Sequence, residues 1–395
     1  MNNRELFFSH QAQTSHFPIG LEITSAEGVY LYGKDGRKYI DLISGIAVSS
    51  LGHGNRRIAS AIRAQTERHL HLMVYGEFIQ EPQARLAGML SESLPHTLSS
   101  CYFTNSGTEA VEGALKLSKR FTGRENIISF NNAYHGSTQG ALSVCGNEEL
   151  KNAYRPLLPG VCFLRFNNIE DLKKINGSTA CVIVEVVQGE SGVRAASPEF
   201  LAELRKQCTA HGALLIFDEI QTGFGRTGNC FAFEHYDVIP DILCLAKSMG
   251  AGMPIGAFIA SSKIMDTLAH HPPLGHITTF GGHPLSCAAA AEHLSILKEE
   301  KIIDLVPGKE KLLAEHLAHP AVKEIRSKGL LVAVEFENEE INKKIISESL
   351  ERGVLTDWFL FDQKSMRIAP PLTISREEII NACGIIRDAA DAVVR

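Results

Sequence analysis

The sequence predicts an α/β fold: a large domain with a mostly parallel central sheet, joined by a smaller α+β domain. Three short apolar runs, at residues 213–217, 242–246 and 255–260, predict strands of that sheet. Each run is bounded by turn-forming or polar residues, as is typical of strands buried on both faces of a parallel sheet. Apolar residues recurring at steps of four, three and four from Ala110 to Phe121 predict a helix.

The length of the chain indicates two or more domains that share a core, because 395 residues exceed the usual size of one domain. We expect residues 1–55 to be an N-terminal segment that joins the small domain. Residues 56–290 are expected to form the large domain, and residues 291–395 the C-terminal small domain. The composition, with 44% hydrophobic and 21% charged residues, is that of an ordinary globular protein.

Charge and cysteine usage argue against several classes of function. A net charge of -6 gives no electrostatic footprint for nucleic acid or an anionic membrane. No apolar run approaches the length of a membrane span, and the N-terminus lacks the apolar core of a signal peptide. The nine cysteines include no C-x-x-C pair, which favours reduced thiols over disulfides or a zinc site. We expect a cytoplasmic protein, with its histidines packed or solvated and no metal bound.

The remaining elements follow from local patterns along the chain. Residues 29–42 predict a β-hairpin around a Gly/Asp turn, and residues 44–54 are loop-like. Further strands are predicted at residues 100–103, 126–130, 181–184 and 330–336. Further helices are predicted at residues 83–94, from Pro284 onward, and at the end of the chain up to about Val394.

Two charged residues directly follow neighbouring apolar runs of the predicted sheet. Asp218 ends the first run and Lys247 ends the second. Ligands of such sheets bind beyond the carboxyl ends of the strands. A buried ion pair is one interpretation. The other is a cofactor site, because a lysine amine forms a Schiff base with an aldehyde, and pyridoxal 5'-phosphate (PLP) is the common protein-bound aldehyde. Asp218 would then keep the pyridine nitrogen of PLP protonated, and Gln221 could reach the ring hydroxyl.

The motifs around these residues resemble those of the class III PLP-dependent aminotransferases, which include the acetylornithine, ornithine and 4-aminobutyrate enzymes. The motifs read Asp218-Glu219-x-Gln221-x-Gly223-x-Gly225-Arg226-Thr227-Gly228 and Lys247 with Gly250-x-Gly252-x-Pro254-Ile255-Gly256. The resemblance covers almost the whole chain. It implies a fold-type-I PLP-dependent transferase with PLP bound in the large domain, and a homodimer that acts on a small-molecule amino donor and a 2-oxo acid acceptor.

The phosphate of PLP is expected at the helix that follows residues 100–103. Ser106, Gly107 and Thr108 lie at its N-terminus, where free backbone N–H groups and the helix dipole favour an anion. A plain capping box between Ser106 and Glu109 is the alternative. The resemblance also places Tyr134 against the cofactor ring with His135 beside it, although Tyr134 could simply pack in a turn. Thr278 and Thr279 match a pair whose threonine reaches the partner subunit's phosphate.

The resemblance implies four substrate-binding residues. Arg367 falls where the family grips the substrate α-carboxylate, which suits a guanidinium fork, although a surface arginine is the alternative. Glu190 matches a glutamate that gates this arginine, and Glu185 matches a supporting position or forms a structural salt bridge. Ser137 stands where the family has an arginine that binds a distal carboxylate. We therefore expect an amino donor whose far end is neutral or cationic, with Glu77 able to bind a cationic end. We also expect 2-oxoglutarate to have a smaller advantage over pyruvate as acceptor. Arg155 or Arg165 could replace the missing cation.

Several other functions remain open at this stage. The cofactor motifs also suit a 4-aminobutyrate or ω-amine:pyruvate aminotransferase, a PLP-dependent decarboxylase or a PLP aminomutase. Residues 223–228 also match G-x-G-x-x-G, the fingerprint of an NAD-dependent dehydrogenase. That motif should directly follow a strand and open a helix, whereas here four residues intervene and residues 229–240 lack a helical period.

Overall fold

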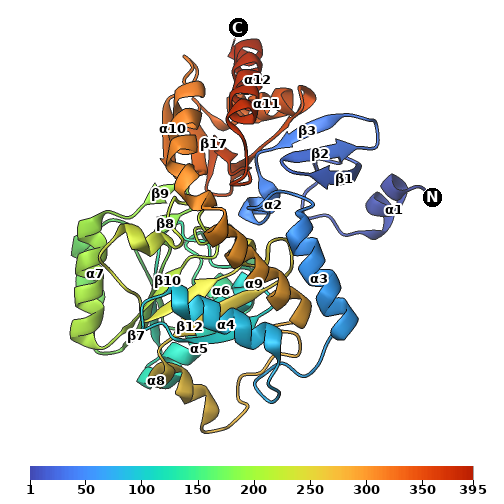
Figure 1. Cartoon of the computed structure of the whole chain (residues 1–395). Helices are drawn as coiled ribbons and strands as arrows, with labels where there is room; N and C mark the ends of the chain where they lie inside the picture. The colour runs from blue at the N-terminus through green and yellow to red at the C-terminus, as the bar shows by residue number, and fades with distance from the viewer. Residues whose placement is uncertain (395) are drawn as a thin grey trace.

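The computed structural model describes residues 1–394 and contains a seven-stranded central sheet (Figure 1). Its strands, in spatial order, are β4 (Ser100–Thr104), β12 (Gly256–Ala260), β11 (Ile242–Leu245), β10 (Leu214–Asp218), β7 (Thr179–Val184), β5 (Asn126–Phe130) and β6 (Val161–Leu164). Strand β12 runs antiparallel to both of its neighbours, and the other pairs are parallel. The predicted mostly parallel sheet is therefore confirmed.

Alternate residues of the central strands face two separate cores, as the period of two in a strand requires. On β10, Ile216 belongs to the same core as Ala110 and Ala114 of helix α5 (Gly107–Thr122). Leu215 and Phe217 belong to the other core, which includes apolar residues of α7 (Pro198–His211) and α9 (Pro284–Glu299). Helices α3 (Arg56–Arg68) and α4 (Glu81–Ser93) pack on α9. Because both faces are covered, polar side chains of the sheet gather at the strand ends.

Two smaller sheets lie above this body in Figure 1, with the helices of the C-terminal third. One sheet has the order β1 (Ile23–Glu27), β2 (Tyr30–Gly33), β3 (Lys38–Asp41) and β15 (Val354–Leu355). The other has the order β13 (Glu324–Lys328), β14 (Leu331–Glu335), β17 (Asp362–Ile368) and β16 (Asp357–Phe359). The helices beside them are α10 (Val306–His316), α11 (Glu339–Glu351) and α12 (Arg376–Val394).

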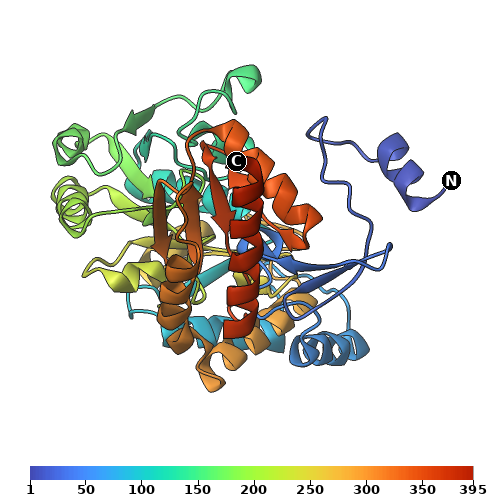
Figure 2. The same cartoon turned by 90° about the horizontal axis from the view of Figure 1, so that it is seen from above.

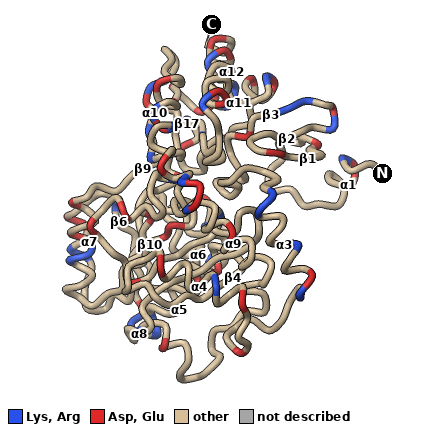
Figure 3. Tube along the Cα trace, viewed as in Figure 1, with Lys and Arg blue, Asp and Glu red and all other residues tan. Residues whose placement is uncertain are grey.

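The N-terminal segment and the C-terminal third share a sheet, because β15 pairs in parallel with β3. The limits of the domains at residues 55 and 290 stay a prediction. Helix α1 (Asn3–His10) buries none of its residues, and Figure 2 shows it standing away from the rest of the molecule. No helix of the described residues is long and apolar enough to cross a membrane. Figure 3 shows acidic and basic residues interspersed along the chain.

Short elements complete the chain. The short helices and strands are α2 (Ser44–Ala47), α6 (Gln139–Ser143), α8 (Ser262–Met265), β8 (Val187–Gln188) and β9 (Arg194–Ala195). The 3-10 helices are η1 (Asn152–Tyr154), η2 (Ile169–Lys174), η3 (Ala232–His235), η4 (Lys247–Gly250), η5 (Asp266–Ala269) and η6 (Ile302–Leu305). After the G-x-G-x-x-G match, the described residues form only η3 before β11, so the dinucleotide motif lacks its helix.

Most of the elements predicted from the sequence are present, with ends shifted by one to three residues. The hairpin of residues 29–42 is confirmed by the antiparallel pairing of β2 with β3. The segment at residues 44–54 contains a single turn, α2, whose Gly45 and Ile46 have non-helical backbone angles. The last helix, α12, ends at Val394 as expected.

Candidate active site

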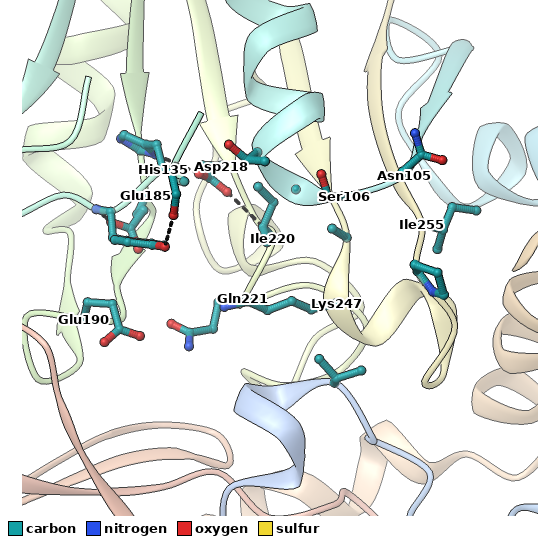
Figure 4. A pocket seen from close by; sticks show the side chains of 18 of the residues that line it. Asn105, Ser106, His135, Glu185, Glu190, Asp218, Ile220, Gln221, Lys247 and Ile255 are labelled. Carbon is teal, nitrogen blue, oxygen red and sulfur yellow. Dashed lines mark hydrogen bonds and ion pairs between the residues drawn. The ribbon is translucent and has the colours of Figure 1, made fainter. Parts of the chain in front are cut away.

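Asp218 and Lys247 lie at the same edge of the sheet and line one cavity of about 490 Å³ (Figure 4). Asp218 ends β10, directly opposite Cys244 of the parallel strand β11, and Lys247 follows two residues after β11 ends. The backbone of Lys247 has a φ of 48°, a conformation that non-glycine residues rarely adopt and that recurs at functional sites. The predicted convergence of these two residues is therefore present.

The carboxylate of Asp218 is held by two contacts. His135 Nδ1 lies 2.7 Å from one carboxylate oxygen, and the Ile220 N–H donates to the other over 3.1 Å. Asp218 and His135 are both buried. The remaining ring nitrogen of His135, Nε2, is buried and has no hydrogen-bond partner among the described residues. The pair thus presents to the cavity a carboxylate that is held in one orientation and can accept a hydrogen bond.

The amine of Lys247 faces a mixed electrostatic environment. Burial lowers its pKa, and Arg367 lowers it further, whereas Glu190, Asp218 and Glu185 raise it. A lowered pKa increases the fraction of neutral amine, which is the form that attacks a carbonyl carbon. Lys247 is therefore suited to form a covalent bond with an aldehyde.

The N-terminus of α5 forms one wall of the cavity through Ser106, Gly107 and Thr108. Ser106 is the N-cap, and its Oγ accepts a hydrogen bond from the Glu109 N–H over 3.4 Å. The capping box, which was the alternative interpretation of this segment, is only half formed, because the Glu109 carboxylate accepts from the Asn105 N–H over 2.7 Å rather than from Ser106. A side chain on Gly107 would meet the Ile220 side chain at 2.8 Å, so Ile220 would have to shift to admit it. The first N–H groups of the helix are available to an anion.

Glu185 organises the loops that carry two other predicted residues. Its carboxylate accepts from the Tyr134 N–H over 3.0 Å and from the Gly189 N–H over 3.1 Å. Burial raises its pKa to about 7. The hydroxyl of Tyr134 lies 3.3 Å from Ser137 Oγ, and both residues line the cavity. The amide nitrogen of Gln221, also on the wall, is buried and has no hydrogen-bond partner among residues 1–394.

Glu190 and Arg367 form a bidentate ion pair, with both N···O distances 2.9 Å. Glu190 lines the cavity, whereas Arg367 is 3% exposed and is absent from the described cavity wall. Glu190 therefore stands between the guanidinium and the cavity. Arg367 also donates to the Trp358 carbonyl over 2.9 Å, and its Nε lies 3.1 Å from a carboxylate oxygen of Asp357.

The other candidates lie outside the described cavity wall. Thr278 Oγ1 accepts from the amide of Asn105, a wall residue, over 3.1 Å, and Thr279 is exposed. Three further residues also lie off the wall: Glu77, which is exposed, Arg155, which pairs with Glu148 at 2.6 Å, and Arg165, which pairs with Asp171 at 2.7 Å. Among residues 1–394, Lys247 is thus the one lysine or arginine on the wall.

Comparison with known proteins identifies the family. The family model described as Aminotransferase class-III matches residues 11–390. The acetylornithine aminotransferase of Methanopyrus kandleri is 41% identical over 396 residues, covering 99% of this chain and 100% of that one. The solved ornithine aminotransferase of Toxoplasma gondii has a TM-score of 0.91 at 31% identity, covering 99% of this chain and 95% of that one. The chain belongs to the class-III aminotransferase family.

The identification confirms the predicted fold type I, the aminotransferase activity and the dependence on PLP. The dehydrogenase alternative is excluded, since the family and its relatives are aminotransferases. The T. gondii structure itself has PLP at partial occupancy in its active site. The cavity of this aminotransferase fits the cofactor in three respects: an amine of lowered pKa, a helix N-terminus, and unpartnered polar atoms on Gln221 and His135.

Sequence reasoning missed several residues of this aminotransferase's site. The apolar part of the wall includes Val48, Ile220, Met253, Pro254 and Ile255. Four of these stand inside or next to the two cofactor motifs, and Val48 stands in the loop at residues 44–54. Their position beside the motif residues was the feature of the sequence that could have identified them as part of the site. Asp357 was missed altogether. Asp357 on β16 pairs directly with Arg367 on β17. The register between two strands cannot be read from the local sequence around either residue.

Proposed function

We propose that this aminotransferase moves the terminal amino group of an ornithine-type ω-amino donor to a 2-oxo acid. The ion pair between Glu190 and Arg367 carries this proposal. While Glu190 covers Arg367, the cavity offers no free guanidinium to an α-carboxylate beside the reacting carbon. An ω-carbon, which bears no carboxylate, suits that state. The relatives named acetylornithine aminotransferase are consistent with such a donor.

Bound PLP supplies an aldehyde carbon that exchanges amino groups and a ring that accepts electrons. Lys247 would hold it covalently through Nζ, and Asp218, fixed by His135, would keep its ring nitrogen protonated. Ser106, Gly107 and Thr108 would bind the phosphate, Tyr134 would stack on the ring, and Gln221 would donate to the ring hydroxyl. Once released, the Lys247 amine can carry a proton to and from the substrate carbon.

The acceptor half of the reaction requires Arg367. When the Glu190 side chain rotates away, the two terminal nitrogens of the guanidinium can bind the α-carboxylate of a 2-oxo acid. Glu185 supports this change by holding the loop before Glu190 through the Gly189 N–H. The same cavity can then serve an ω-amine and a 2-oxo acid in turn.

Ser137 sets the preference at the far end of the substrate. It lies on the wall and offers a hydroxyl at the position where the resemblance to the acetylornithine and ornithine enzymes implies an arginine. Since Arg155 and Arg165 are paired away from the wall, neither replaces that cation in this chain. We therefore infer a donor with a neutral or cationic far end and a small advantage of 2-oxoglutarate over pyruvate. Glu77 would have to reach a cationic end from the partner subunit, since it lies off the wall of its own chain.

The functional unit would be a cytoplasmic homodimer with shared active sites. Exposed apolar side chains occur on two segments near the cavity: Leu70, Leu72, Phe78, Ile79, Leu274, Ile277 and Phe280. The segments touch, because the rings of His71 and Phe280 lie 4.8 Å apart. Exposed apolar side chains on two touching segments favour burial against a second copy, and Thr279 on the second of these segments could then reach the partner's phosphate. The nine cysteines are unpaired, which favours a reducing compartment.

A matrix of donors and acceptors tests the proposal on the wild type, Ser137→Arg and the uncharged control Ser137→Gln. A hydrogen bond to a charged group is worth about 1.5–3 kcal/mol, so the arginine should favour distal carboxylates by roughly ten- to a hundredfold. The glutamine should not. Strong wild-type preference for 2-oxoglutarate, with no gain from the arginine, would contradict the role of Ser137. Failure to transaminate any ω-amino donor would contradict the proposed function itself.

A further inference from the structure

Arg367 has a second carboxylate partner, Asp357, which stays beside it when Glu190 moves away. Asp357 on β16 lies directly opposite Arg367 on β17, and its Oδ1 approaches Arg367 Nε to 3.1 Å. Glu190 instead occupies the two terminal nitrogens of the guanidinium. The two carboxylates therefore face different edges of one cation.

The contact with Asp357 is an ion pair without hydrogen-bond geometry. Both Asp357 Oδ1 and Arg367 Nε are buried, and neither has a hydrogen-bond partner among the described residues. The Trp358 carbonyl, rather than Asp357, completes the hydrogen bonds that orient the guanidinium. The contribution of Asp357 to this site is thus mainly its charge.

The net charge around Arg367 affects how tightly an incoming carboxylate binds. With Glu190 and Asp357 ionised, the three side chains carry a net charge of -1. When the acceptor carboxylate takes the place of Glu190 on the guanidinium, the displaced glutamate keeps its charge close by, so the net charge falls to -2. Without Asp357, which the strand pairing places opposite Arg367, the net charge after acceptor binding would be only -1. Two like charges on one partly buried cation repel each other, since the interior screens them less than water does.

We propose that Asp357 is a permanent counter-ion of Arg367 that weakens the binding of the 2-oxo acid acceptor. The inference rests on the proposed role of Arg367 in the acceptor half-reaction. Weaker binding keeps the guanidinium from trapping the α-carboxylate, so Glu190 can return and the site can accept the next ω-amine. In this scheme Asp357 lowers the affinity of Arg367 for the α-carboxylate of the acceptor and does not contact the reacting atoms.

The decisive variant is Asp357→Asn, with Asp357→Ser as a second neutral replacement in case one folds poorly. Glu351→Gln is the matched control, because Glu351 is an exposed carboxylate that pairs with Arg37 at 3.2 Å, away from the cavity. Each half-reaction is followed separately, with 2-oxoglutarate and pyruvate as acceptors and ornithine as the ω-amine. Binding of the acceptor is also measured by calorimetry and by the fluorescence of Trp358, the single tryptophan of the chain and the neighbour of Asp357.

We expect the Asp357 variants to bind both acceptors about tenfold more tightly, which corresponds to about 1.4 kcal/mol. The ω-amine half-reaction and the control should stay within about twofold of wild type. Unchanged or weaker acceptor binding in both neutral variants would overturn the inference. Absence of turnover in the wild type, with acceptor binding still measurable, would instead count against the proposed function and leave the binding comparison decisive for Asp357.

Discussion

His135 Nδ1 lies 2.7 Å from a carboxylate oxygen of Asp218, and both side chains are buried where β10 ends. The histidine fixes the carboxylate in one orientation before any ligand binds. A preorganised charge of this kind stabilises a developing charge without reorganisation during the reaction. The pair thus links the end of a central strand to the chemistry of the cofactor ring.

Asp218→Asn should retain the fold and bind PLP but lose turnover by roughly 10²–10³-fold, because a neutral amide cannot hold the pyridine proton. Steady-state kinetics with saturating cofactor measure the loss. Asp241→Asn is the control, since Asp241 pairs with Arg205 at the amino end of the neighbouring strand, outside the cavity. Turnover of Asp218→Asn within about threefold of wild type would show that Asp218 has only a structural role.

Lys247 should be the lysine that holds PLP covalently. Borohydride reduction followed by digestion and peptide sequencing should place the label on Lys247. Lys151 is a useful internal comparison, because it is buried, donates to the Cys145 carbonyl and lies off the cavity wall. Label on Lys151, or on any lysine other than Lys247, would refute the assignment.

Removal of the gate should change which amine reacts. Glu190→Ala leaves Arg367 uncovered, so an α-amino donor gains a free guanidinium for its carboxylate. We expect the ratio of α-amino to ω-amino turnover to rise by about tenfold or more, since a charged hydrogen bond is worth about 1.5–3 kcal/mol. Glu190→Gln, which keeps the shape and removes the charge, should give a smaller shift. An unchanged ratio in both variants would mean that no such gate operates.

The sequence indicated the centre of the site better than its periphery. Asp218 and Lys247 end apolar runs, and this local pattern was sufficient to place them at one edge of a sheet. The direction of β12 was not encoded in that way, because an apolar run looks the same in either orientation. Asp357 depends on the register between β16 and β17, which is set by the turn and by packing around both strands. Non-local pairing of this kind requires the structure.

Sharing of the active site across a dimer can be tested by complementation. A Lys247→Ala subunit and a Thr279→Ala subunit should each be weakly active or inactive alone. In a mixed dimer one site carries both defects and the other carries neither, so activity should partly recover. If Thr279 serves its own subunit, mixed dimers that are shown to form will stay inactive.

Asp357 should also make acceptor binding depend on pH. Burial raises its pKa to about 6; Glu190 and Asp41 also raise it, and Arg367 opposes the shift. Another charge near this strand is Lys343, which lies 5.0 Å from the Trp358 ring. Above this pKa the carboxylate is charged and repels the acceptor, whereas below it the protonated acid resembles the asparagine variant. The ratio of acceptor KM between wild type and Asp357→Asn should therefore be about ten near pH 8 and approach one below about pH 5.

The raised pKa of Asp357 also predicts which of wild type and Asp357→Asn is the more stable at a given pH. An acid whose folded pKa exceeds its unfolded value of about 3.9 stabilises the fold fully below that value, and the contribution is lost as pH rises through about 6. Asp357→Asn should thus melt at a higher temperature than wild type near pH 8 and at the same temperature near pH 4.

The ratio of acceptor KM between wild type and Asp357→Asn cancels titrations common to both proteins, including those of Glu190 and the cofactor. A KM ratio independent of pH, together with equal melting temperatures at both pH values, would show that Asp357 does not carry the charge assigned to it.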